Sequence, residues 1–168
     1  MRTDLPQGDL RLLETAQARE LLNAALYARL GVVWTDGTPR VIPTWFHWTG
    51  TDVVMPTFVA GPKAGVRHPA RRLAALRASP DVAISIGTDG VPPLALSIRG
   101  RAVVHEVDGL ADEYVLCAER YLGEEAAAAL VDSMRQPGTR QARIVVRPSW
   151  AGLLDFRTRF PSPLGGVG

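Results

Sequence analysis

The chain has 168 residues, of which 46% are hydrophobic and 21% charged, and this composition is typical of one globular domain with a buried core rather than of a disordered segment. Its formal net charge of +2 predicts no general attraction to nucleic acid, and no apolar run approaches the ~20 residues that span a bilayer. Residues 1–14 are too acidic and too interrupted for a secretory signal peptide, so we expect one domain over 1–168, with a core at 10–163, that works in the cytoplasm away from membranes.

Cysteine and histidine are scarce in this chain. Cys117 is the single cysteine, which excludes an intramolecular disulfide and a multi-cysteine zinc site, and we interpret it as a packing residue because it lies in a helical pattern. His47, His68 and His105 share no metal-ligand spacing, and the motifs of zinc hydrolases, serine hydrolases and Walker-type nucleotide sites are absent. The sequence therefore predicts no metal site and assigns no catalytic residue, so a cofactor would have to supply any redox chemistry.

Hydrophobic periodicity and turn residues divide the chain into helices and strands. The predicted elements, in chain order, are a helix at 8–30, strands at 28–35, 40–48 and 52–58, a helix at 68–78, strands at 81–86 and 94–108, helices at 109–123 and 124–135, a strand at 141–156, and an extended tail at 156–168. Consecutive hairpins favour an antiparallel sheet. The predicted fold class is therefore mainly β with flanking helices, in which six antiparallel strands close into a small split barrel.

Turn and breaker residues refine this prediction. Asp36-Gly37 is a strong turn dipeptide between the first two strands. Pro43 lies inside the second strand, and because proline has no N–H for a ladder it favours an edge or bulged position there. Gly100 lies within the long strand 94–108 and predicts a bulge or bend.

Two consecutive arginines follow the proline that begins the predicted helix 68–78. Pro69 suits a first helical turn, but Arg71 and Arg72 stand at the positive end of the helix dipole, where cations are disfavoured. One interpretation is an anion site, because the unpaired N–H groups of a helix start and two guanidinium forks suit a phosphate. The other is that both side chains are solvated, since the 19 cationic residues are all arginine except Lys63.

The strands before this helix carry further candidate residues. Thr57 ends the strand 52–58, so its hydroxyl could also reach the anion. The strand that contains Pro43 offers free backbone polar groups to which a flat ring could hydrogen-bond. Trp45 and Trp48 fall on opposite faces of a regular strand, so we expect one in the core and the other exposed, against a ligand or at a subunit contact.

The predicted helix 109–123 carries several charged residues. Asp112 and Glu113 lie near its start, and Glu119 and Arg120 near its end. We interpret them as a solvated helix face rather than as an acid–base pair.

Several stretches taken together resemble the pyridoxamine 5'-phosphate oxidase-like flavin proteins, also called the FMN-binding split barrel. The resemblance covers about residues 10–163, and its order and spacing are more specific than any single motif. The stretches that carry it are ARLGVVWTDGTPRVIPTWFHWTGTDVVMPT, ARRLAALRASPDVAISI, LSIRGRAVVHEVDG, DEYVLCAERYLG and RIVVRPSWAGLLDFRTRFPS.

This resemblance implies a flavin-dependent oxidoreductase that acts on a small molecule. It implies a six-stranded split barrel that works as a homodimer, with FMN in each of two clefts between the subunits. The residues to which it assigns cofactor binding are Arg71, Arg72 and Thr57 at the phosphate and the backbone of Ile42, Pro43, Thr44 and Trp45 at the ring.

The sequence departs from the family pattern at four places. The loop VAGPKAGVR before the basic pair is longer than relatives usually have, so we expect Lys63 and Arg67 to share or cover the phosphate. The second basic residue is usually lysine and here is Arg72, which keeps the charge and adds a planar fork. The glutamine of true pyridoxamine phosphate oxidases falls near Ala95 and is absent, and their substrate-binding C-terminal end is not recognisable in DFRTRFPSP. We therefore do not expect vitamin B6 oxidation. Relatives that use a deazaflavin coenzyme suggest a deazaflavin-dependent reductase as the alternative, and a non-enzymatic flavin or haem carrier, with His47 as axial ligand, is the third.

Overall fold

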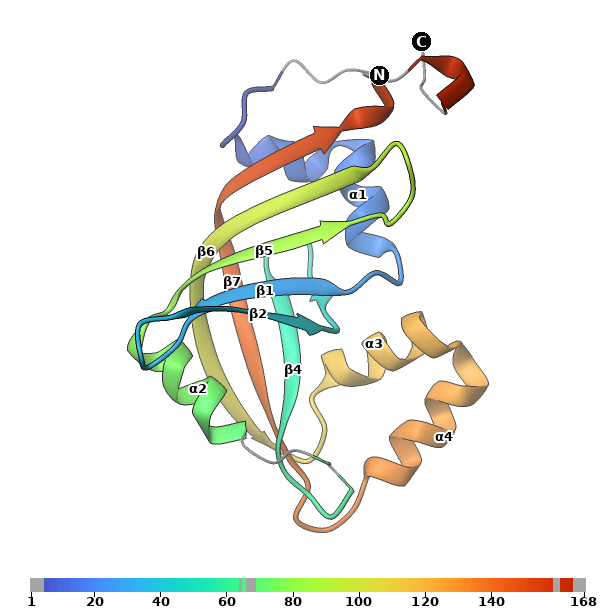
Figure 1. The fold of residues 1–168 in the computed structure, drawn as a ribbon. Coiled ribbons are helices and arrows are strands. Elements are labelled where there is room, and N and C mark those ends of the chain that lie inside the picture. The colour runs from blue at the N-terminus through green and yellow to red at the C-terminus, as the bar shows by residue number, and fades with distance from the viewer. Residues whose placement is uncertain (1–4, 64, 66–68, 159–160, 165–168) are drawn as a thin grey trace.

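The structure is a computed structural model that describes residues 5–63, 65, 69–158 and 161–164. A curled antiparallel sheet forms its centre, with helices packed against it (Figure 1). The elements are η1 (Leu10–Glu14), α1 (Ala16–Asn23), β1 (Ala28–Val33), β2 (Pro39–Thr44), β3 (His47–Trp48), β4 (Val53–Ala60), α2 (Pro69–Ala78), β5 (Asp81–Gly87), β6 (Leu94–Asp108), α3 (Asp112–Leu122), α4 (Glu124–Met134), β7 (Arg140–Asp155), η2 (Phe156–Thr158) and η3 (Ser162–Leu164).

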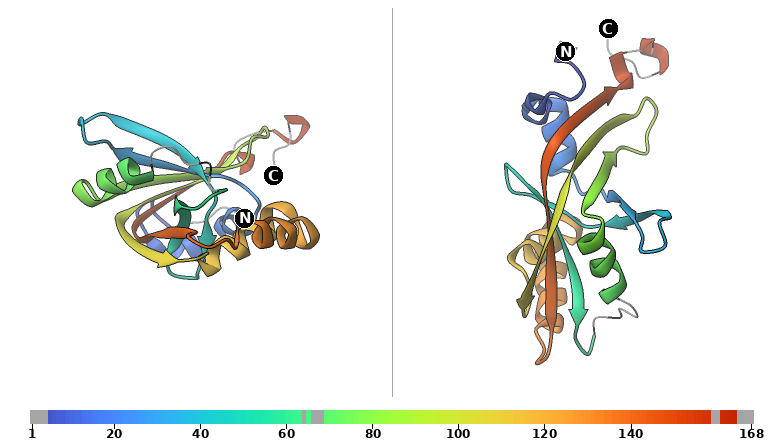
Figure 2. Two further views of the ribbon diagram at one scale, coloured as in Figure 1. Left: turned by 90° about the horizontal axis from the view of Figure 1, so that it is seen from below. Right: turned by 90° about the vertical axis from the view of Figure 1, so that its left-hand side faces the viewer.

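The described strands form one seven-stranded sheet rather than the predicted six-stranded closed barrel. Its order is β2-β1-β5-β6-β7-β4-β3, and every neighbouring pair is antiparallel. β2 and β3 are the two free edges, so the sheet coils strongly without closing (Figure 2). The prediction of a mainly β protein with flanking helices is confirmed, whereas the strand count and the closure are wrong.

The extra strand arises because the predicted strand 40–48 is broken in two. β2 ends at Thr44 and pairs with β1, whereas His47 and Trp48 form β3 and pair with β4 at the opposite edge. The chain crosses from one edge to the other at Trp45 and Phe46. Pro43 accordingly lies on an edge strand, opposite Arg29 of β1. An edge strand has no neighbour on its outer side, so the missing N–H of proline removes no hydrogen bond of the sheet on that side.

Two other boundaries differ from prediction. The predicted helix 8–30 is interrupted at Thr15, whose backbone is extended and whose side chain accepts from the Ala18 N–H as the N-cap of α1. The helix then ends at Asn23, before β1 begins at Ala28. In the C-terminal tail, the described residues 156–158 and 162–164 form single 3-10 turns instead of running extended.

The bulge predicted at Gly100 is confirmed. The register between β6 and β7 shifts between Arg99 and Gly100. A Cβ atom at residue 100 would lie 2.3 Å from the carbonyl oxygen of Arg147, so the two strands approach too closely there for any side chain.

The core has two parts, one on each side of β4. The main cluster fills the inner face of the sheet under η1, α1 and α2 and includes Val53 and Met55 of β4. A second cluster packs α3 and α4 against Phe58, and Figure 1 shows α2 and the α3–α4 pair on opposite sides of β4. Because side chains alternate along a strand, Thr57 lies on the α2 side with Val53 and Met55, and Phe58 on the α3 side. Among the described residues, no helix is long and apolar enough to cross a membrane.

Candidate functional site

The centre of the candidate site is a contact between α2 and β4. Nη1 of Arg72, in the first turns of α2, donates a hydrogen bond of 3.4 Å to Oγ1 of Thr57. The contact is partly buried, and burial lowers the pKa of the Arg72 guanidinium. No carboxylate among the described residues pairs with Arg72, so a half-buried cation has only a neutral hydroxyl beside it. A desolvated cation without a counter-charge is an arrangement that an anion stabilises.

The other predicted cationic residues lie around this contact with different exposure. Arg71 is exposed on α2, one residue before Arg72, and Lys63 is exposed in the turn that follows β4. Neither has a hydrogen bond to Thr57 or Arg72 in the described part of the chain. Arg67 lies outside the described residues. The structure therefore brings together Arg72 and Thr57 and leaves Arg71 and Lys63 as exposed cations, without a contact to this pair among the described residues.

The predicted ring-binding stretch is distributed over both parts of the core. Ile42 packs against the main cluster, Pro43 is exposed, and the Thr44 hydroxyl donates to the Trp45 carbonyl oxygen at 3.2 Å. Trp45 turns toward α3, where its ring lies 6.0 Å from that of Tyr114. The same tyrosine ring lies 5.2 Å from Phe58, the neighbour of Thr57 in β4. One tyrosine thus links the end of β2 to the strand that carries the arginine contact.

The aromatic character of α3 was not predicted from the sequence. Trp45 stacks on Tyr121, with ring centroids 5.0 Å apart and planes 4° from parallel. Tyr114, Ala118 and Tyr121 follow one another at i, i+4 and i+7, and this helical spacing is the pattern that could have revealed a packed face. Trp48, by contrast, packs against the main cluster. The expectation that one tryptophan is in the core and the other exposed is wrong: both are half-buried, and each packs against a different core cluster because the strand breaks between them.

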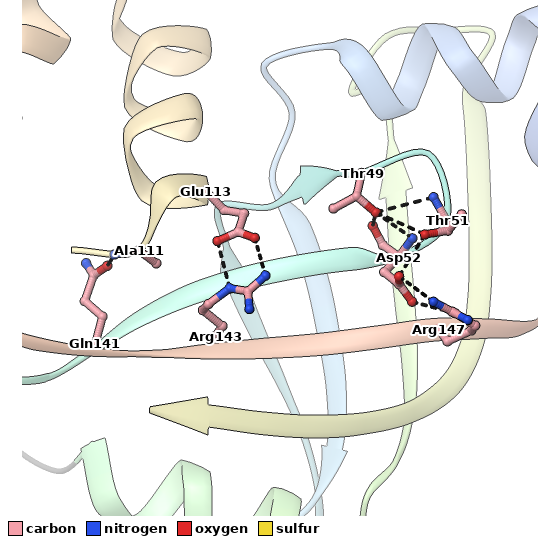
Figure 3. Close-up of polar contacts among 8 residues, drawn as sticks. All are labelled: Thr49, Thr51, Asp52, Ala111, Glu113, Gln141, Arg143 and Arg147. Carbon is pink, nitrogen blue, oxygen red and sulfur yellow. Dashed lines mark hydrogen bonds and ion pairs between the residues drawn. The ribbon is translucent and has the colours of Figure 1, made fainter. Parts of the chain in front are cut away.

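The interpretation of α3 as a solvated charged face is wrong for two of its four residues. Glu113 is buried and pairs with Arg143 of β7 through two hydrogen bonds, of 2.9 and 2.5 Å (Figure 3). These bonds hold the pKa of the Glu113 carboxyl below its usual range. Arg120 is half-buried and stacks on Phe46. A single sequence cannot show that β7 places an arginine opposite Glu113, because the two residues are thirty positions apart.

Further polar contacts fix the elements around the site to β7. Gln141 is buried, and its side-chain oxygen accepts from the backbone N–H of Ala111 at the start of α3. Asp52, in the turn between β3 and β4, accepts two hydrogen bonds of 2.8 and 2.9 Å from Arg147 (Figure 3). β7 is therefore a rigid support for both α3 and β4.

Cys117 and His47 are the residues that the sequence offers as a packing residue and as an axial haem ligand. Cys117 is fully buried in α3, and burial raises the pKa of its thiol to about 12, which agrees with a packing residue. His47 is half-buried in β3; its pKa is lowered by burial and by Arg120, against an opposing effect of Glu113. Within the described ranges, no group of three or more His, Cys, Asp or Glu side chains could hold a metal ion.

Comparison with known proteins identifies the family. Residues 14–151 match the family model described as pyridoxamine 5'-phosphate oxidase. The chain belongs to this family. The resemblance inferred from the sequence is thereby confirmed, and membership in the pyridoxamine 5'-phosphate oxidase family places the chain among flavin- and deazaflavin-related proteins. None of the curated protein sequences compared with the chain matches it.

Solved structures of similar fold include proteins with different names. A structure named F420 reductase is 26% identical, with a TM-score of 0.58 over 80% of this chain and 94% of that one. A conserved hypothetical protein from Mycobacterium tuberculosis is 20% identical, with a TM-score of 0.63 over 95% of this chain and 92% of that one. A putative pyridoxamine 5'-phosphate oxidase from Listeria innocua is 20% identical, with a TM-score of 0.52 over 87% and 98%. The last two likenesses support the fold alone.

Proposed function

We propose that the protein is an oxidoreductase that binds a phosphate-bearing flavin or deazaflavin cofactor and acts on a small molecule. The observation that carries the proposal is the half-buried Arg72 guanidinium against Thr57, without a carboxylate partner among the described residues. The family provides the chemical context, since the cofactor, when bound, supplies hydride transfer and the protein supplies position and electrostatics.

The donor set fits a phosphate group. Arg72 offers a planar fork that matches phosphate oxygens, and Thr57 offers a hydroxyl from the opposite side. Arg71 and Lys63 are exposed cations close in sequence that add positive charge. At the other end of the proposed site, β2 is an edge strand, so backbone groups of Ile42–Thr44 on its outer side are available to the polar edge of a ring.

A specific observation favours the deazaflavin over FMN. The structure named F420 reductase is 26% identical to this chain, and coenzyme F420 is a deazaflavin. FMN remains the cofactor that the basic pair first suggests. Titrating the purified protein with FMN and with F420, after recording its absorbance from 300 to 550 nm as purified, separates the two.

We also propose a homodimer in which the partner completes the cofactor cleft. The support is an apolar groove of about 590 Å³ on the outer face of the sheet, lined in part by Val33 and Val41. A second groove shares Gly31 and Val41 with it, so one continuous surface crosses β2, β1, β5 and β6. Gly31 and Ala83 at its middle would let a second copy approach closely, with arginines such as Arg40 and Arg99 also lining it.

The decisive experiment substitutes the arginines of α2 one at a time. Arg72→Ala should weaken cofactor binding by about 1.5–3 kcal/mol, the usual contribution of a hydrogen bond to a charged group. Arg71→Ala should weaken it less, because Arg71 is exposed and solvent screens its charge. Arg77→Ala is the matched control, since this arginine of the same helix pairs with Glu106 instead. If Arg72→Ala binds the cofactor as tightly as Arg77→Ala does, Arg72 does not hold a phosphate and the proposal fails.

A further inference from the structure

Arg120 joins three parts of the chain that meet at the end of β2. It lies in the last turn of α3, and its Nη2 donates to the carbonyl oxygen of Phe46, in the crossover between β2 and β3. Its Nη1 donates to the carbonyl oxygen of Leu22 in α1 at 3.2 Å. The guanidinium also stacks on the ring of Phe46, 4.5 Å from its centroid. One side chain thus holds both the backbone and the ring of the residue that follows Trp45.

Tyr121, the next residue of α3, contacts the same region through its hydroxyl and its ring. Its hydroxyl donates to the carbonyl oxygen of Leu26, just before β1, and accepts from Nη2 of Arg120 at 3.3 Å. Its ring is the one that stacks in parallel on Trp45. Arg120 and Tyr121 therefore clamp the backbone and the indole at the end of β2, although neither lies on a strand of the sheet.

The clamp is specific for a guanidinium. Two carbonyl oxygens from separate elements are reached by the two terminal nitrogens of one planar fork while its face covers Phe46. The third nitrogen, Nε, is buried and has no hydrogen-bond partner in the described part of the chain. A lysine would supply the charge, but it cannot reach both carbonyl oxygens with fixed geometry and stack at the same time.

We propose that Arg120, with Tyr121, is a positioning residue for the ring of the cofactor: from α3 it fixes the crossover at Trp45 and Phe46, and thereby the place of β2 against the ring. The inference rests on the proposed function, in which β2 faces the ring and Arg72 holds the phosphate. It divides the affinity into a ring part and a phosphate part, because no hydrogen bond among the described residues joins Arg120 to Arg72 or Thr57.

The test measures ring affinity and phosphate affinity separately. Riboflavin and 5-deazariboflavin carry a ring without phosphate, inorganic phosphate carries no ring, and FMN carries both. Arg120→Met and Arg120→Lys are compared with Arg135→Met, an exposed arginine at the end of α4. Tyr121→Phe keeps the stack on Trp45 and removes only the hydroxyl, so it is a second and milder variant. Thermal unfolding establishes that each variant is folded.

The expected result is a crossed pattern. Arg120→Met should lower the affinity for the ring ligands and for FMN by about tenfold, which corresponds to about 1.4 kcal/mol. The affinity for inorganic phosphate, measured by its competition with FMN, should not change. Arg120→Lys and Tyr121→Phe should lie between wild type and Arg120→Met, and the visible absorption band of bound flavin should shift in the same order. Arg72→Ala should do the opposite and lower the affinity for FMN and phosphate but not for riboflavin. Arg135→Met should bind FMN, riboflavin and phosphate with wild-type affinity.

The outcomes separate the two proposals. Wild-type protein that binds neither FMN nor a deazaflavin overturns the proposed function, and this inference with it. The positioning role alone is overturned if wild-type protein binds cofactor through Arg72 but the Arg120 variants do not separate the two ligands. That is the case if they weaken the binding of ring and phosphate ligands equally, or weaken neither. If Arg120→Met does not fold, the lysine and phenylalanine variants decide by the same criterion.

Discussion

Glu113 is the residue whose charge matters most to the attachment of α3. Its carboxylate is buried and bonded to Arg143, so Glu113→Gln leaves the arginine without its counter-charge. We expect this change to lower the free energy of unfolding by about 2 kcal/mol at pH 7, the size of a hydrogen bond between charged groups. Chemical denaturation measures it, with Glu125→Gln on exposed α4 surface as the matched control.

The stability contributed by the Glu113–Arg143 pair should depend on pH. Because Arg143 keeps the pKa of Glu113 below its usual value, the folded protein binds fewer protons at this site than the unfolded chain does. The stability from the pair is therefore complete above the unfolded pKa of about 4.3 and is lost as the pH falls through the lower folded value. The difference between wild type and Glu113→Gln should shrink below about pH 4. A difference that stays constant down to pH 2 would contradict the assignment.

Arg71 and Arg72 show what sequence alone could predict at the scale of one residue. Their position at the start of α2 followed from turn residues and periodicity, whereas the prediction that Thr57 ends its strand is wrong, since β4 continues to Ala60. Consecutive helical side chains point about 100° apart, so only one of two neighbours can face β4. Which one does so depends on how α2 packs against the sheet, and the contact with Thr57 identifies Arg72.

At the scale of elements, long regular strands were predictable and irregular connections were not. The bounds of β6 match the prediction of 94–108, because its alternation holds from Leu94 to Val104 and turn residues bound the stretch on both sides. The stretch 40–48 also looks like one strand, yet it splits because Trp45 and Phe46 are held by Tyr121 and Arg120 from a distant helix. Local pattern cannot show a break that a tertiary contact imposes.

Gly100 lies where β6 and β7 approach too closely for a side chain to fit, and this can be tested by substitution. Gly100→Ala would place a Cβ atom 2.3 Å from the Arg147 carbonyl oxygen, so β6 and β7 would have to separate at their bulge. We expect a loss of about 3 kcal/mol, at the upper end of what overpacking costs. Gly90→Ala is the control, because nothing lies within 4 Å of a Cβ atom there. Equal unfolding midpoints for the two variants would show that the strands yield more easily than the geometry implies.

For the whole molecule, the neighbouring hairpins were predictable and the order of the sheet was not. β1 with β2, β3 with β4 and β5 with β6 are joined by short connections, and their turn residues indicate the pairing. The pairs β1–β5 and β4–β7 join strands far apart in the chain, and nothing local encodes them. The site depends on these distant pairs, since they set the positions of β2 and β4. Its residue types were therefore predictable, whereas its geometry was not.

The proposed homodimer can be tested at Val41, on the outer face of the sheet. Val41 is 69% exposed on the edge strand β2 and lines both grooves of the outer sheet face. A cation buried there against a second copy would lie among arginines, because Arg40 and Arg99 line these grooves too, so Val41→Lys should shift the protein from dimer to monomer in analytical ultracentrifugation. Leu116→Lys, at a 44% exposed position on α3, is the control and should leave the dimer intact.

Cofactor affinity then tests whether the partner completes the cleft. If it does, the monomeric Val41→Lys protein should bind cofactor more weakly than wild type, and raising the protein concentration should restore both dimer and affinity together, because the two equilibria are linked. A Val41→Lys protein that is monomeric but binds cofactor as wild type does would place the whole site within one subunit. A Val41→Lys protein that stays dimeric would move the interface away from this face of the sheet, since burying a lysine beside Arg40 and Arg99 would be costly at its centre.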